Sequence, residues 1–113
     1  MLSKQSRLKK KKDFENVSES GQQVSGRFLV LKFANNQFDA TRFGFVVSKK
    51  ISKKAVDRNR IKRRMRNVCK NEIIKLKKGI DIVFFAKKNI INSEFADIGK
   101  DIKQTFKRAG LYV

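Results

Sequence analysis

The sequence predicts an α/β sandwich in which helices pack on a central sheet, formed by one domain over residues 1–113. Short segments rich in β-forming residues alternate with longer segments whose apolar residues recur every three to four positions. A strand, a long helix and another strand follow one another, which is the order of a βαβ unit with parallel strands. We therefore expect a two-layer α/β (α+β) fold in the order helix, two or three strands, basic helix, strand, helix.

The N-terminal part is predicted to be a flexible basic arm followed by a short helix. Residues 1–11 are rich in Lys and Arg and have little to bury, so we expect them to be mobile until a partner binds. Regular structure should begin near Lys12. Phe14 and Val17 lie three positions apart on one helix face, and Gly21 is suited to end the helix.

Two strands are predicted next. Residues 27–34 are rich in β-forming residues and too short for a comfortable helix, and the turn Asn35-Asn36-Gln37 follows them. Residues 38–48 alternate along a second strand, with Thr41, Phe43, Phe45 and Val47 on one side. Gly44 lies on the other side, where the missing side chain lets another group approach closely.

A long basic helix is predicted to begin near Asp57, whose carboxylate can cap the first amides, and to end before Gly79. At 100° per residue, its apolar side chains share about a third of the circumference. They are Ile61, Met65, Val68, Cys69 and Leu76. Nearly opposite lies a basic stripe formed by Asn59, Arg63, Arg66 and Lys70. One face should therefore pack on a core while the other presents cations.

The last two elements complete the sandwich. Residues 81–86 form a short apolar strand, and a final helix is predicted from about Ser93 to Arg108. On that helix Ile98, Ile102 and Phe106 recur every four residues, and Gly110 with Leu111 should terminate it. General rules make a crossover between parallel strands right-handed in nearly all proteins.

The charge of the chain predicts a polyanionic partner. The 29 Lys and Arg residues against 10 Asp and Glu give a formal net charge of +19, which favours a nucleic acid. A membrane surface fits less well, because the apolar residues are spread over strand-like segments and no apolar run is long enough for a span or a signal sequence. Cys69 is the only cysteine and should be a buried, inert thiol, which suits the cytoplasm.

These residues resemble a known family. Ser48-Lys49-Lys50 at the end of a strand, followed by Arg58-Asn59-Arg60-Ile61-Lys62-Arg63 and Arg66, is similar to the RNR motif of the bacterial ribonuclease P protein subunit. The resemblance extends to Phe14, Arg42-Phe43-Gly44 and Asp81-Ile82-Val83 and covers nearly the whole chain. It implies a rare left-handed crossover through the basic helix.

The resemblance also implies a function. Family members assist a large catalytic RNA that removes the 5′ leader from precursor tRNA with Mg²⁺, so the chain would be an enzyme subunit with no catalytic residue or metal site of its own. The expected partners are the ribonuclease P RNA subunit and precursor tRNA, without membrane or DNA. Residues expected to face the RNA subunit are Arg58, Asn59, Arg60, Lys62, Arg63, Arg66 and, from the stripe, Lys70. Residues expected to line a cleft for the leader are Phe14, Lys49, Lys50, Lys87 and Lys88, whereas Ser18 stands where relatives commonly carry a second aromatic residue.

Residue chemistry agrees with this division of labour and leaves two points open. Arginines in a row bridge phosphates, and a phenylalanine beside lysines suits a single strand. An autonomous nuclease is disfavoured, since histidine is absent and the ten carboxylates are scattered. A structural RNA-binding protein of ribosomal type would share the size and charge, and Phe14 could be a core residue instead of a stacking platform.

Overall fold

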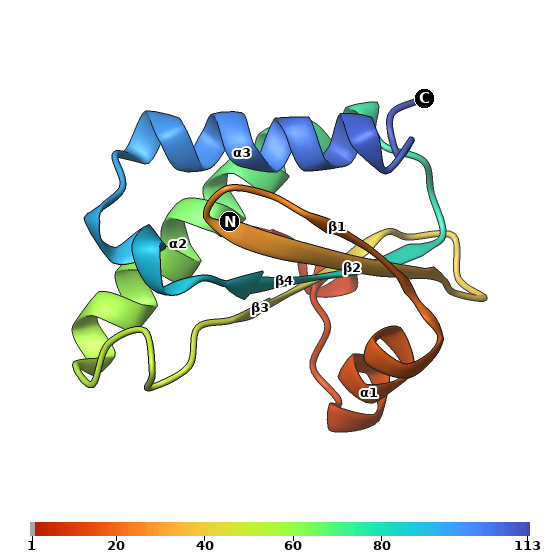
Figure 1. The fold of residues 1–113 in the computed structure, drawn as a ribbon. Helices are drawn as coiled ribbons and strands as arrows, with labels where there is room; N and C mark the ends of the chain where they lie inside the picture. The colour runs from red at the N-terminus through yellow and green to blue at the C-terminus, as the bar shows by residue number, and fades with distance from the viewer. Residues whose placement is uncertain (1) are drawn as a thin grey trace.

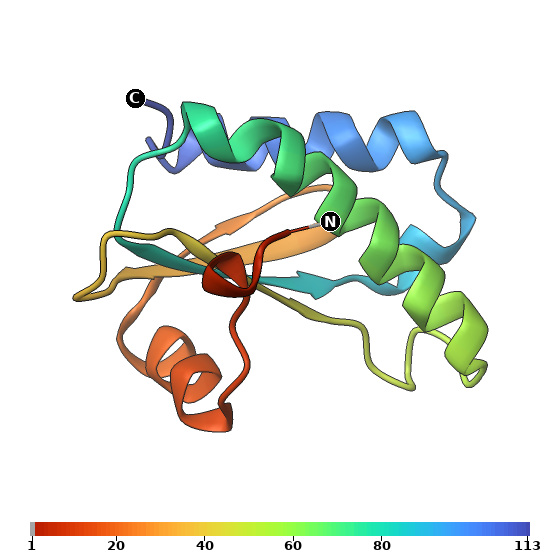
Figure 2. The ribbon, with the colours of Figure 1, turned by 180° about the vertical axis from the view of Figure 1, so that it is seen from behind.

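The computed structural model describes residues 2–113 and shows a mixed four-stranded sheet with three α-helices (Figure 1). The strands are β1 (Gln22–Ser25), β2 (Leu29–Asn35), β3 (Arg42–Val46) and β4 (Ile80–Ala86), in the sheet order β1-β2-β4-β3. The helices are α1 (Lys11–Ser20), α2 (Ala55–Glu72) and α3 (Phe95–Arg108), with short 3₁₀ turns at Lys4–Ser6, Ile73–Lys75 and Lys88–Asn92. Both views place α2 and α3 on one side of the sheet and α1 on the other (Figure 2). The predicted α/β sandwich is thus confirmed, with α1 added on the opposite face.

The main core lies between the sheet and the pair α2 and α3. All five residues of the apolar arc predicted for the basic helix are buried, although α2 ends at Glu72 and Leu76 follows the next 3₁₀ turn. Ile98, Ile102 and Phe106 of α3 are buried as well. The Phe106 ring lies 5.7 Å from that of Phe84 and 6.4 Å from that of Phe43, centroid to centroid, so α3 is anchored on both parallel strands. α3 ends as predicted, since Gly110 has a φ of 70° and the Leu111 amide donates to the Phe106 carbonyl at 3.0 Å.

The connection through α2 positions the basic helix. β3 and β4 pair in parallel, from Arg42 opposite Asp81 to Val46 opposite Phe85. The βαβ unit is therefore confirmed, and the left-handed crossover stays a prediction. The expected cap is wrong: α2 begins at Ala55, and Asp57 makes no cap hydrogen bond because its carboxylate accepts from the Ser52 hydroxyl at 3.0 Å and pairs with Arg60 at 3.4 Å.

The strands differ from the prediction at their ends. The optional third strand is β1, whose position was not predicted, because its sequence is polar and mostly exposed and it exists only through antiparallel pairing with β2. β2 begins at Leu29 instead of Arg27, since the Asp101 carboxylate of α3 accepts the Arg27 and Phe28 amides at 2.8 Å each. β3 is shorter than predicted, and Phe38 belongs to the loop before it.

The N-terminal segment also differs from the prediction. Leu2 and Leu8 are buried, and the Leu8 amide donates to the Phe43 carbonyl at 2.8 Å, which covers the free edge of β3. The expectation that residues 1–11 have little to bury is therefore wrong for residues 2–8, while Met1 lies outside the described residues. Within residues 2–113, no helix has both the length and the apolar character needed to cross a membrane.

Candidate nucleic-acid interface

The outer face of α2 presents the predicted basic stripe. Because the apolar arc fixes the rotation of this helix on the core, the polar side chains opposite it must face solvent. The exposed residues of the predicted set are Asn59, Arg60, Arg63, Arg66 and Lys70, whereas Arg58 and Lys62 are half-buried. One continuous helix therefore brings five of the seven predicted RNA-subunit residues to the surface.

Arg58 has a structural contact at the start of α2. Its Nη1 donates to the Ser52 carbonyl at 2.8 Å, and the Ser52 hydroxyl in turn donates to Asp57. These contacts join the helix start to the loop that carries Lys49 and Lys50. Arg58 thus fixes the orientation of this loop relative to the stripe, in addition to the charge that it contributes.

A pocket of about 600 Å³ lies on the basic face of α2. It is lined by Arg60, Arg63, Arg64, Arg66, Asn67 and Phe95. Phe95 is 45% exposed at the start of α3, and the Arg64 guanidinium carbon lies 5.7 Å from its ring centroid. Four guanidinium groups around one hollow can contact several phosphates at once. Arg64 and Phe95 were missed by the sequence analysis, because they meet only through the packing of α3 on α2.

The opposite face of the sheet carries aromatic rings beside α1. Phe14 is half-buried and packs over Gly44, where an added Cβ would overlap the ring. The close approach predicted at Gly44 is thus made by Phe14. Phe14 and Phe85 both belong to a small apolar cluster with Val17 and Val83, and both remain partly accessible. Phe14 is therefore neither a fully buried core residue nor a free platform.

Lys32 and Phe85 form a pair on this face that sequence reasoning missed. The Lys32 ammonium lies 4.9 Å from the Phe85 ring centroid. The two residues come from β2 and β4, which pair antiparallel with Val30 opposite Phe85. An available signal was the alternation within β4, where Phe84 is buried in the main core and Phe85 must point to the other side.

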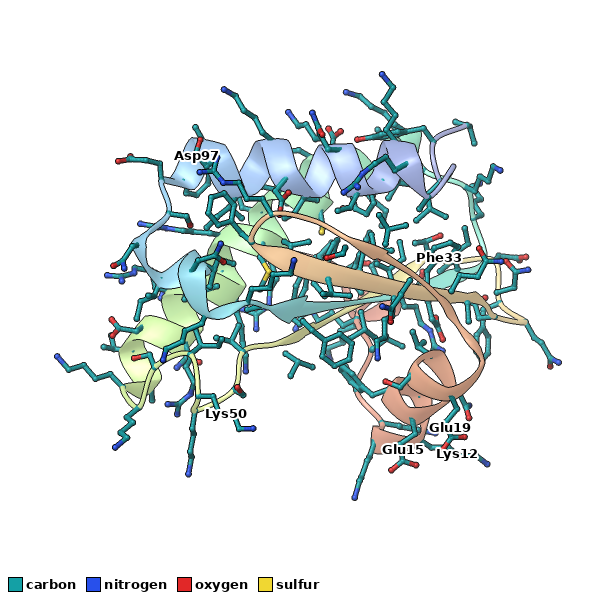
Figure 3. All side chains as sticks on the ribbon, viewed as in Figure 1. Lys12, Glu15, Glu19, Phe33, Lys50 and Asp97 are labelled. Carbon is teal, nitrogen blue, oxygen red and sulfur yellow. The ribbon has the colours of Figure 1, made fainter. Side chains whose placement is uncertain are left out.

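The lysines predicted for the leader occupy different settings. Lys49, Lys50 and Lys88 are exposed, and Figure 3 shows Lys50 pointing away from the sheet on the loop between β3 and α2. Lys87 is half-buried, because its ammonium donates to the Ser25 hydroxyl at 2.8 Å and to the Gly26 carbonyl at 2.6 Å. Both ribbon views place the loop between β3 and α2, like α1, on the side of the sheet away from α3. The Lys87 ammonium is thus bonded to the end of β1 and to the segment between β1 and β2, whereas Lys49 and Lys50 are available to a ligand.

The Cys69 thiol and the Tyr112 hydroxyl, which could in principle react, have structural roles. Burial raises the pKa of the Cys69 thiol well above its usual value, so it stays a neutral, buried side chain as predicted. Burial and the hydrogen bond to Glu72 raise the pKa of Tyr112. Within residues 2–113, no three His, Cys, Asp or Glu side chains are grouped so as to hold a metal ion.

Comparison with known proteins identifies similar chains. A family model described as Ribonuclease P matches residues 2–110. The ribonuclease P protein component of Syntrophomonas wolfei is 40% identical over 99% of this chain and 93% of its own length, and that of Fusobacterium nucleatum is 38% identical over 90% and 95%. The solved structure of the Staphylococcus aureus RNase P protein has a TM-score of 0.88 at 30% identity and covers 96% of this chain and 98% of its own. The Thermotoga maritima RNase P protein gives 0.82 at 28% identity over 90% and 96%.

Proposed function

The chain belongs to the ribonuclease P protein family, and on that basis we propose that it binds both the catalytic RNA of ribonuclease P and the 5′ leader of precursor tRNA. Membership makes it a component of a tRNA-processing enzyme with an RNA partner. The observation that carries the finer proposal is the orientation of α2, whose apolar arc is buried and whose cations Arg60, Arg63 and Arg66 surround one pocket. We assign this face to the RNA subunit, because a row of cations suits a folded RNA that is recognised through its phosphates.

The leader is assigned to the opposite face of the sheet. Phe14 and Phe85 offer accessible ring surface there, while Lys32, Lys49 and Lys50 supply positive charge. This combination suits a single strand, because each base has a face to stack and each phosphate needs a counter-charge. The sheet separates this surface from the outer face of α2, so one chain can hold the RNA subunit and the leader at the same time.

Catalysis is assigned to the RNA subunit, with Mg²⁺ bound mainly by RNA. The described residues do not fit a Mg²⁺ site, since no three of their acidic, cysteine or histidine side chains are grouped and the buried carboxylates are tied to other groups. Asp81 pairs with Arg42, Asp101 accepts backbone amides of the segment before β2, and Glu72 accepts from Tyr112. The part proposed for this chain is to position substrate and to neutralise phosphate charge, which helps cations approach the RNA. The proposed compartment is the cytoplasm.

The decisive experiment measures cleavage of precursor tRNA at low Mg²⁺. The purified chain alone should leave the substrate uncut at every Mg²⁺ concentration. A bacterial ribonuclease P RNA alone should need high Mg²⁺, and the added chain should lower this requirement to about the low millimolar range. Failure to stimulate the RNA would contradict the proposal and favour a structural RNA-binding protein. Site-specific cleavage by a preparation of the chain that is free of RNA and of contaminating nucleases would overturn the assignment of catalysis to the RNA.

A further inference from the structure

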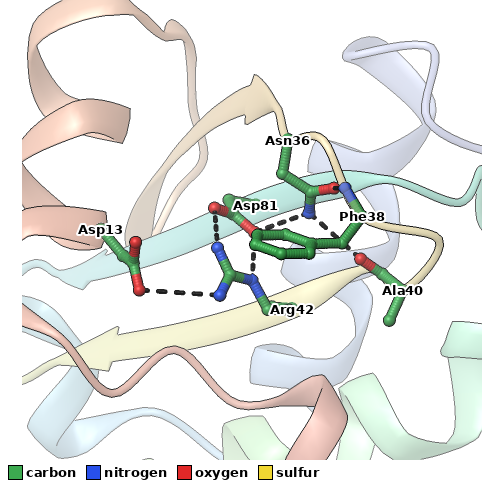
Figure 4. Close-up of polar contacts among 6 residues, drawn as sticks. All are labelled: Asp13, Asn36, Phe38, Ala40, Arg42 and Asp81. Atoms are coloured by element: carbon green, nitrogen blue, oxygen red, sulfur yellow. Dashed lines mark hydrogen bonds and ion pairs between the residues drawn. The ribbon is translucent and has the colours of Figure 1, made fainter.

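An exposed phenylalanine stands in the loop that joins β2 to β3. Phe38 is 59% exposed although its loop is firmly held. The Phe38 amide donates to Asn36 Oδ1 at 2.8 Å, and the Asn36 side-chain amide donates to the Ala40 carbonyl at 3.1 Å and to Asp81 Oδ1 at 2.8 Å (Figure 4). The loop therefore holds the exposed ring in a fixed position at the surface.

The Arg42 guanidinium supports this ring from one side. Its Cζ lies 4.7 Å from the Phe38 ring centroid. Asp81 fixes the guanidinium by two hydrogen bonds, at 2.8 Å from Nε and 2.7 Å from Nη2, and Asp13 lies 3.6 Å from Nη1. The hydrogen bond to Asp81 raises the pKa of Arg42, so the cation under the ring is permanent. Phe38 is consequently a rigid aromatic platform with most of its surface free.

A cationic pocket of about 460 Å³ opens beside Phe38, between the loop, the N-terminal segment and the start of α1. The volume falls within the range of about 300 to 1,000 Å³ typical of small-ligand pockets. Its charged lining has five cations, Lys4, Arg7, Lys9, Lys10 and Arg42, against the carboxylates Asp13 and Asp39. Lys4, Lys9 and Lys10 are exposed at its rim. We call this hollow the Phe38 pocket.

We propose that the Phe38 pocket binds one nucleobase of single-stranded RNA, stacked on Phe38, with the adjoining phosphates on Lys4, Lys9 and Lys10. A free phosphate or an acidic peptide would use the lysines but not the exposed ring. A stacked base with its backbone uses both, which is how proteins hold single strands without reading sequence. The inference goes beyond the proposed function, because it places RNA on residues outside both proposed surfaces.

The pocket adjoins the proposed leader surface. Asp13, which pairs with Arg42 under the Phe38 ring, immediately precedes Phe14 on α1. Arg42 and Asp81 lie on the same face of the sheet as Gly44, over which Phe14 packs. A single strand that lies across this face can therefore continue around the start of α1 into the Phe38 pocket.

The test uses the full-length chain and a single-stranded oligoribonucleotide of about six nucleotides with 2-aminopurine at one position. Affinity is measured by fluorescence anisotropy, and stacking by quenching of the 2-aminopurine. Phe38→Ala should weaken binding about tenfold, because the free energy of stacking one base corresponds to about that factor in affinity. The quenching should fall, and what remains comes from stacking on the proposed leader surface. Phe38→Trp should bind at least as tightly, and Phe38→Leu should resemble Phe38→Ala although it still covers the Arg42–Asp81 pair.

The controls separate this site from a structural role and from the proposed function. Ile74→Ala removes an apolar side chain that is even more exposed than Phe38, does not line the pocket and should leave binding unchanged. Circular dichroism reports whether each variant is folded. If Phe38→Ala does not fold, the binding measured with Phe38→Leu tests the proposal in its place. Wild-type affinity in a folded Phe38→Leu variant would overturn the inference and make the ring a lid on the ion pair. Stimulation of the RNA subunit is measured separately, so its loss or survival bears on the proposed function alone.

Discussion

At the scale of single residues, Gly44 sets the position of the Phe14 ring. The ring rests where a side chain at position 44 would otherwise stand, so Phe14 is supported by backbone on one side and half-exposed on the other. Phe14 also packs against the apolar cluster of Leu8, Val17 and Val83, which come from the segment before α1, from α1 and from β4. Phe14 therefore has a packing role and an accessible face together, which its sequence position alone left undecided.

We expect Phe14→Leu to weaken binding of precursor tRNA by the assembled enzyme about fivefold or more and to leave mature tRNA unaffected. Leucine keeps an apolar contact over Gly44 but has no flat ring, and only the precursor has a leader base to stack. Affinities for the two tRNAs, measured with the same enzyme preparation, check the expectation. Phe14→Ala is less informative, because truncating a packed phenylalanine costs about 3 to 5 kcal/mol of stability. An equal loss for both tRNAs would assign Phe14 to the fold or to the RNA subunit.

Lys87 shows why charge in the sequence is an incomplete guide to a site. It was predicted for the leader together with Lys88, yet its ammonium is held by the Ser25 hydroxyl and the Gly26 carbonyl. These partners are 62 and 61 residues away in the chain and meet it only because β1, β2 and β4 pair. The Arg42–Asp81 pair, separated by 39 residues, escaped prediction for the same reason.

At the scale of elements, α2 combines a buried apolar face and an exposed basic face in one continuous helix. Its apolar arc, the strand β4 and the helix α3 were all predicted, because helical and strand periodicity is a local property of the sequence. β1 and the pairing of residue 7 with Phe43 were not, because both depend on a partner strand and carry no period of their own. The basic stripe could be predicted together with the helix, because both follow from the same periodicity. The contribution of Phe95 to the pocket on this face could not, because it depends on where α3 packs against α2.

We expect the variant Arg63→Ala/Arg66→Ala/Lys70→Ala to flatten the salt dependence of RNA-subunit binding by about two to three units of slope. Each lost phosphate contact removes about 0.7 to 0.9 from the slope of log affinity against log salt. These three side chains are exposed, so the fold should survive, whereas Arg58 is better left intact because it is bonded to Ser52. Binding is measured over a series of salt concentrations.

A matched control removes the same charge from another helix. Lys100→Ala/Lys103→Ala/Lys107→Ala takes three exposed lysines from α3, none of which lines the pocket of Arg63 and Arg66. This variant should change the slope far less. Equal slopes for the two variants would mean that net charge, and not the face of α2, determines RNA binding.

At the scale of the whole molecule, a net charge of +19 on 113 residues opposes the compact state. Within residues 2–113, five carboxylates have a cationic partner, and only Asp81 is largely buried together with its partner, Arg42. Most of the cations at the surface therefore face one another through solvent. A polyanion removes this repulsion and stabilises the fold when it binds. The same charge that supports the proposed RNA binding thus limits the stability of the free chain.

We expect the melting temperature of the free chain to rise by about 3 to 6 °C when sodium chloride is raised from about 50 mM to about 500 mM, because the screening length falls well below the spacing of most surface charges and relieves about 1 kcal/mol of repulsion. Calorimetry or circular dichroism measures the shift. The variant Lys100→Gln/Lys103→Gln/Lys107→Gln keeps residues with good helix propensity on α3 while removing three charges. It should melt higher than the wild type at low salt and respond less to added salt. A melting temperature that is independent of salt in both proteins would show that the cations are already too far apart to oppose folding, and would leave RNA binding as the only consequence of the charge.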